Sequence, residues 1–137
     1  TAVIIDHIIA ITSAEEDGRW FKDVFGDETN IDLKLRRMTS KAAMKARRNL
    51  EKGYRKHLKN GVYPDDIAID IMTEHLAKGV VVDWKGLYDR DGNVIEFSPE
   101  AALTLLKKLP TLRDMIAVMA QNLDNFRVEA REDTSKN

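Results

Sequence analysis

Positive charge is concentrated in one segment of the chain, and that segment must lie at the surface of any fold. Residues 34–59 contain eleven Lys or Arg side chains and one acid, Glu51, so the segment has a net charge of +10 against −11 elsewhere. Such side chains are almost never fully buried without partners. Apolar residues recur within the segment at three- and four-residue spacing: Ala43, Ala46, Leu50, Tyr54 and Leu58. This spacing predicts a helix, capped by Ser40 and reaching about residue 58, with its cations facing solvent.

Other parts of the chain have sequence patterns that predict β-strands. Ile31, Leu33 and Leu35 alternate with polar residues, and residues 26–30 before them are turn formers, which predicts a hairpin over residues 18–37. Asp91-Gly92 lies between β-forming residues and predicts a second hairpin over 80–97. Residues 2–11 are apolar at eight of ten positions and have no basic start, so we expect a short strand or buried segment and not a signal peptide.

Three further helices are predicted. Pro64 precedes two acids and opens a helix that closes near Lys78-Gly79. Ser98-Pro99-Glu100 is a compact start for a helix to about residue 109. Thr111 and Asp114 have capping-box spacing for a last helix to about residue 130.

The expected fold class is therefore α+β, predominantly helical, with about four helices and one or two small β-hairpins. We expect one domain over residues 1–137. Its parts would be a β-rich region over 1–37, a helical region over 40–130 that contains the 80–97 hairpin, and a frayed polar tail over 131–137.

Nothing in the sequence indicates catalysis, a metal or a cofactor. The chain has no Cys, and its three His residues are scattered at positions 7, 57 and 75. Asp89, Asp91 and Gly92 resemble part of a calcium loop, but Leu87 and Ser98 would occupy two positions that require oxygen ligands. No apolar run approaches 18 residues, so we expect no membrane span. The sequence predicts a protein that is not an enzyme.

Three interpretations of the basic segment remain open. It could bind nucleic acid, dock on an acidic protein or on another copy of the chain, or be a solvated face. Nucleic acid is disfavoured, because Tyr54 is the only aromatic residue in the segment and the pI is about 6.3. Weak, salt-sensitive self-association is expected. Guanidinium groups pair with carboxylates in bidentate fashion, so the candidate contacts are the arginines: Arg36, Arg37, Arg47, Arg48 and Arg55.

A family resemblance begins in the second half of the chain. The elements, in order, are Trp84-Lys85-Gly86, an acidic turn with Asp91-Gly92, the helix start Phe97-Ser98-Pro99-Glu100, and a late Asn125-Phe126 pair. Gly18-Arg19-Trp20 and Arg36-Arg37-Met38 extend the similarity upstream. In order and spacing these elements resemble the tail assembly chaperones of long-tailed bacteriophages and related prophages. The same residues can be explained as fold determinants, and we interpret them first in that way.

The resemblance implies a non-enzymatic binding protein. Chaperones of this kind keep the long, helical tape measure protein soluble and help to recruit tail tube subunits. It further implies action in the cytoplasm of the host bacterium and absence from the mature virion. In that family a longer form with a C-terminal extension is often made by ribosomal frameshifting. Two alternatives are kept: a nucleic-acid-binding regulator that uses the basic helix over residues 40–59, and another phage tail or head–tail connector component.

Overall fold

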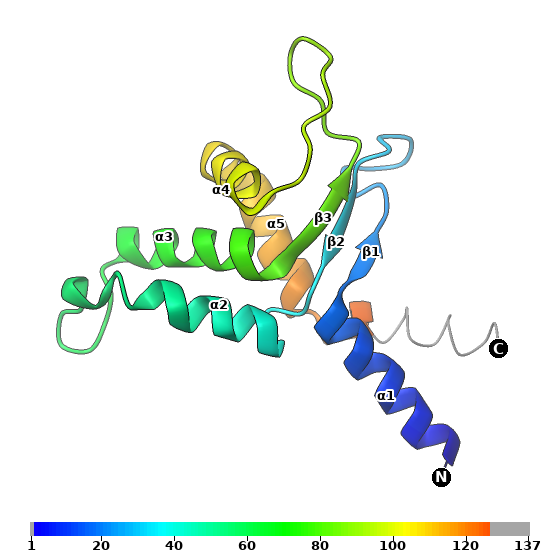
Figure 1. Cartoon of the computed structure of the whole chain (residues 1–137), viewed down its shortest axis with the longest axis horizontal. Coiled ribbons are helices and arrows are strands. Elements are labelled where there is room, and N and C mark those ends of the chain that lie inside the picture. Colours follow the sequence, from blue (N-terminus) through cyan, green and yellow to red (C-terminus); the bar gives the residue numbers. More distant parts are fainter. Residues whose placement is uncertain (1, 127–137) are drawn as a thin grey trace.

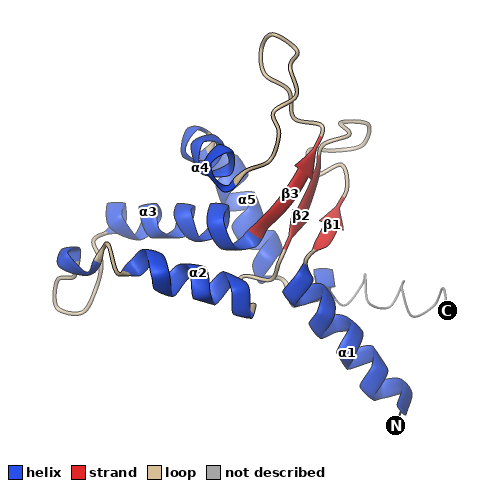
Figure 2. Cartoon of the chain, viewed as in Figure 1, coloured by secondary structure: helices blue, strands red, loops and turns tan. Residues whose placement is uncertain are grey.

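A computed structural model describes residues 2–126 of the chain, and helices predominate in it (Figure 1, Figure 2). The α+β, helix-dominated fold class is confirmed. In chain order the elements are α1 (Ala2–Asp17), β1 (Arg19–Phe21), β2 (Asp32–Leu35), α2 (Lys41–Glu51), the 3₁₀ turn η1 (Arg55–His57), α3 (Asp65–His75), the π-helical turn η2 (Leu76–Val80), β3 (Val81–Lys85), α4 (Pro99–Lys108) and α5 (Pro110–Gln121).

The three strands form one antiparallel sheet in the order β1-β2-β3. The first predicted hairpin is confirmed, because Phe21 pairs with Leu33 and Arg19 pairs with Leu35. Leu33 and Leu35 are almost completely buried, as the alternating pattern predicts.

The second predicted hairpin is largely wrong. β3 does not pair with residues 94–97 but with β2, where Trp84 lies opposite Leu33. A small remnant of the hairpin persists farther out, as a bridge between Tyr88 and Val94 around a tight turn. The physical reason is burial: pairing with β2 places Val81 and Trp84 in the main core, whereas a separate two-stranded hairpin would leave them poorly covered.

The prediction for the N-terminal segment is also corrected: the segment is not a strand, and the described side chains of residues 5–11 are exposed or only partly buried. It forms α1, which projects away from the rest of the molecule (Figure 1). The segment has no Gly or Pro before Gly18, so nothing interrupts a helix until Gly18 adopts a φ of +94° and its amide bonds the Ala14 carbonyl. Ile5, Ile8 and Ile9 are 56–59% exposed.

Helices α2 and α3 lie side by side and extend away from the sheet with the connection between them (Figure 1). We call this unit, residues 41–75, the arm. Ser40 caps α2 as predicted, by accepting a bond from the Ala43 amide. However, α2 ends at Glu51 and is followed by η1, so it is shorter than predicted. α3 ends at His75, and η2 continues the helical run through Lys78 and Gly79 to Val80, close to the predicted end. Gly79 packs on the Ala43 backbone.

The C-terminal helices cover the other side of the core. Ser98 caps α4 at the Ala101 amide, and Pro99 is the first helical residue, as predicted. The capping box at Thr111 is wrong: Pro110 suits a first helical turn, so α5 starts earlier and Leu109 is its cap. α5 ends at Gln121, residues 123–126 are helical again, and the remainder of the predicted helix and the 131–137 tail lie outside the described residues.

One hydrophobic cluster joins the sheet to the helices. Its largest fully buried apolar members come from both: Leu33, Leu35, Leu76, Leu106, Ile116 and Phe126. Phe126 meets Phe21 edge-on, with 6.0 Å between ring centroids. The arm, α4 and the C-terminal end of α1 pack on this core, which therefore sets the positions of the surfaces described below.

Candidate functional site

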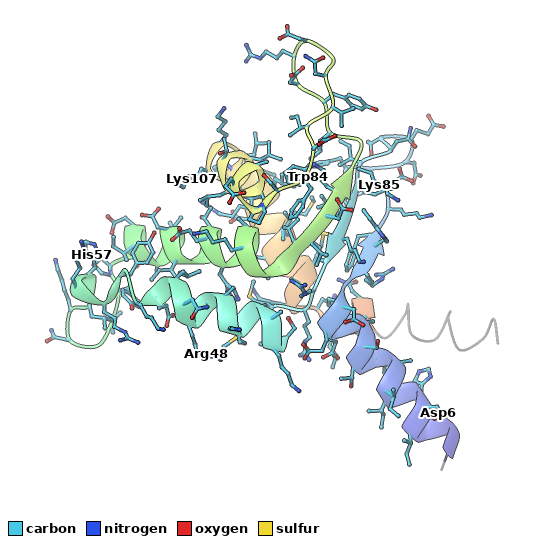
Figure 3. All side chains as sticks on the ribbon, in the orientation of Figure 1. Asp6, Arg48, His57, Trp84, Lys85 and Lys107 are labelled. Carbon is cyan, nitrogen blue, oxygen red and sulfur yellow. The ribbon has the colours of Figure 1, made fainter. Side chains whose placement is uncertain are left out.

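The basic face of the arm is exposed along α2 and its connection to α3. Arg48 points outward from α2 in Figure 3. None of the exposed cations in this row forms an ion pair with another residue in the range 2–126. The row consists of Lys41, Lys45, Arg48, Lys52, Arg55, Lys56 and Lys59. A row of unpaired, hydrated cations can attract an acidic partner at little desolvation cost.

The five predicted arginines separate into two groups. Arg36 donates from Nε to the Glu16 carbonyl at 3.0 Å, and Arg37 pairs with the Glu15 carboxylate at 3.1 Å. These two side chains hold the end of α1 against the residues that follow β2, and they serve the fold. Arg47 pairs with Glu51 at 2.8 Å within α2. The structure therefore leaves Arg48 and Arg55 as exposed, unpaired members of the set in the described chain.

The neighbouring helix α3 carries the opposite charge on its exposed side. Asp65, Asp66 and Asp70 are exposed, and the two aspartates in the first turn suit the helix dipole. The arm thus presents a basic helix and an acidic helix next to each other.

The predicted Trp-Lys-Gly motif lies at the end of β3. Trp84 is 7% exposed, donates from Nε1 to the Ile95 carbonyl at 2.7 Å, and meets Phe97 edge-on at 5.2 Å between centroids. The Nζ of Lys85 lies 4.3 Å from the centre of the Trp20 ring. These contacts hold the loop between β3 and α4 against the sheet, so the motif acts first as a fold determinant.

The two motif glycines have different surroundings. Gly86 has a φ of +84°, and a Cβ there would overlap the carbonyl oxygen of Asn30. Gly92 has a φ of +82° at the exposed turn beside Asp91, with open space around it. The Asp89 carboxylate accepts bonds from the Asn93 and Asp91 amides in this turn, and these bonds, that from Asn93 foremost, lower the pKa of Asp89.

This turn offers no built metal site. Its carboxylate already bonds backbone amides, and no group of three or more His, Asp or Glu residues within 2–126 is arranged to hold a metal ion. Likewise, no helix in that range is long and apolar enough to cross a bilayer.

An apolar groove runs along α4 beside the β3–α4 loop. Its volume is about 320 Å³, and its lining is Ile95, Glu100, Ala101, Thr104, Leu105 and Lys108. Glu100 and Lys108 lie near the two ends of α4, so opposite charges flank an apolar floor. The loop beside it extends from the body (Figure 1) and carries Tyr88 and Val94, both more than 60% exposed. Such a groove can receive the apolar side of a helix or an extended peptide.

Sequence reasoning missed the groove and the exposed face of α1. The groove forms where the β3–α4 loop packs beside α4, and the spacing of apolar residues in the sequence does not predict that contact. For α1 a signal was present, because Ile5, Ile8 and Ile9 have helical spacing.

The comparisons with known proteins identify one family. Residues 34–137, which include the arm, β3 and the groove, match the YdaY prophage protein family. No curated protein and no solved structure matches the chain. Because the match covers most of the sequence, the chain belongs to the YdaY prophage protein family.

Proposed function

We propose that this prophage protein is a tail assembly chaperone, which binds the tape measure protein and tail tube subunits while a phage tail is built. The observation that carries the proposal is the apolar groove on α4, which has Glu100 and Lys108 near the two ends of the helix and Ile95 of the adjoining loop in its lining. Its prophage family and the resemblance of residues 81–126 to phage tail chaperones support the same conclusion.

The chemistry of the groove fits such a partner. A long helical protein that has not yet assembled exposes apolar helix faces, which would otherwise aggregate. A groove with an apolar floor can cover part of one face, and charges at its two ends can favour one direction of the bound helix. On this proposal the protein performs no catalysis, acts in the host bacterial cytoplasm and leaves before the virion is complete.

Co-purification with the tape measure protein of the same prophage tests the proposal. Thr104 is an exposed residue of the groove lining, so Thr104→Arg and Thr104→Asp place bulk or a negative charge in the groove. We expect each to reduce capture of the tape measure protein at least tenfold. Thr111→Arg and Thr111→Asp make the same chemical changes at an exposed position of α5 and serve as matched controls. Equal capture by groove and control variants would contradict a role for the groove.

The exposed cation row favours a second activity of the same protein, weak self-association. On this proposal Arg48 and Arg55 meet acidic residues of another copy, so association weakens as salt rises. Light scattering of the wild type and of an Arg48→Glu, Arg55→Glu double variant tests it. Tight binding of duplex DNA at physiological salt, lost in the same double variant, would instead support the nucleic-acid-binding regulator.

A further inference from the structure

Helix α1 exposes an apolar stripe whose ionised neighbours are all acidic. Ile5, Ile8 and Ile9 are each more than half exposed, and Asp6 is exposed beside them. Residues 1–18 contain four acids and no Lys or Arg. A helix that binds a lipid surface usually carries Lys or Arg on its polar face, so α1 has the wrong charge for that role. Its chemistry fits a protein surface that is apolar and basic.

The end of the arm farthest from the sheet has that complementary chemistry. We call residues 55–62 the tip. Leu58 and Val62 are exposed there, Val62 by 67%, and Arg55, Lys56 and Lys59 are exposed between and before them. Within residues 52–64 there is no acid; Asp65 and Asp66 follow at the start of α3.

The tip is also held by backbone hydrogen bonds of its own. Asn60 and Gly61 both have positive φ, and Lys59 and Val62 exchange two backbone hydrogen bonds of 2.8 and 3.0 Å across them. A fixed two-residue turn loses little conformational freedom when it binds.

We propose that α1 of one copy docks on the tip of a second copy. The two surfaces match in apolar character and have opposite charge, and they lie at opposite ends of one molecule. Figure 3 shows Asp6 near the free end of α1 and His57 at the far end of the arm. One chain cannot join its own two surfaces, whereas two chains can. The contact is heterologous, so it continues from copy to copy as a ring or an open filament.

The strength of the contact follows from its size. It rests on a few isoleucines against Leu58 and Val62, with Asp6 near the tip cations, so it is smaller than the interface of a stable complex. Association is therefore reversible and concentration-dependent. High salt weakens it without abolishing it, because the apolar part does not depend on ionic screening. This inference rests on the self-association proposed above and not on binding of the tape measure protein.

Sedimentation velocity of the full chain tests the inference with two complementary variants. Ile8→Glu disables α1, and Val62→Glu disables the tip; both positions are exposed, and circular dichroism melts should match the wild type. The wild type should increase in mass beyond a dimer as concentration rises. Each variant alone should remain a monomer. A mixture of the two should form a heterodimer and stop there, because only one intact α1–tip pair can be made. Val118→Glu, an equally exposed change on α5, should behave as the wild type.

The other outcomes separate the possible errors. If the wild type associates and Val62→Glu associates equally, α1 does not use the tip, and pairing of α1 with α1 would explain the result. If the mixture of variants stays monomeric while the wild type associates, the inference is also wrong. If the wild type is monomeric at every concentration, self-association itself is refuted, while the test of tape measure binding stands on its own.

Discussion

At the scale of single residues, Tyr54 connects the two helices of the arm. Its hydroxyl donates to the Glu74 carboxylate at 2.6 Å, which, together with burial, raises the pKa of Tyr54 to about 12. Burial opposes ionisation of Glu74, but the bonds from Tyr54 and Lys78 outweigh it and lower the pKa of Glu74 below 4.5. Tyr54→Phe should lower the free energy of unfolding by about 1 kcal/mol. Tyr63→Phe is the control in urea unfolding, and equal stability of both variants would contradict the assignment.

The buried His75 should make the free energy of unfolding depend on pH. It is 1% exposed, and burial, then the charge of Arg47, lowers its pKa from 6.5. The unfolded chain therefore binds a proton at His75 more readily than the folded chain does. The free energy of unfolding is highest above pH 6.5 and falls as the pH drops below that value. The slope is at most about 1.4 kcal/mol per pH unit. His75→Leu should reduce the change in unfolding free energy between pH 7 and pH 5.5, measured by urea unfolding at both pH values. The same change with pH in the variant and the wild type would refute His75 as the cause.

Gly86 and Gly92 form a matched pair for backbone strain. Both have positive φ, so an added side chain costs about 1–2 kcal/mol at either position. At Gly86 the new Cβ also overlaps the Asn30 carbonyl, whereas nothing surrounds Gly92. Gly86→Ala should therefore lower the melting temperature clearly more than Gly92→Ala. Equal melting temperatures would mean that the β2–β3 junction relaxes freely.

At the scale of elements, local sequence patterns predicted the features that depend on neighbouring residues alone, such as helix caps and strand alternation. Ser40 and Ser98 cap helices as their sequences indicate, and the alternation at residues 31–35 gives β2. The pairing of β3 could not be predicted, because the turn at residues 89–93 signals a local hairpin while burial of Trp84 depends on a strand fifty residues away. Nor does a short apolar run distinguish a strand from a helix, so the strand predicted within residues 2–11 is wrong.

Trp84 is the residue through which β3 holds the β3–α4 loop. Trp84→Ala should destabilise the fold by about 3–5 kcal/mol and give unfolded or insoluble protein. Trp84→Phe keeps much of the packing but loses the bond to the Ile95 carbonyl, so it should fold with reduced stability. Thermal melts distinguish the two. A soluble Trp84→Ala protein with wild-type melting would mean that Trp84 is dispensable to the fold.

At the scale of the whole molecule, the sequence predicted the chemistry of the candidate surfaces better than their locations. The basic face of α2 lies at the surface, because so many cations cannot be buried. Arg36 and Arg37 belong to the same charged segment, yet they bond α1, a helix that the prediction from sequence missed. The groove likewise depends on where the β3–α4 loop packs, which is a tertiary property.

The central claim, that this protein acts as a tail assembly chaperone, concerns the solubility of another protein. The most direct measurement is the soluble fraction of the tape measure protein of the same prophage, expressed alone or with this chain at matched levels. The account predicts that the tape measure protein is largely insoluble alone and becomes soluble, in a complex with this chain, when both are present. An unchanged soluble fraction, with no complex on size-exclusion chromatography, would contradict it.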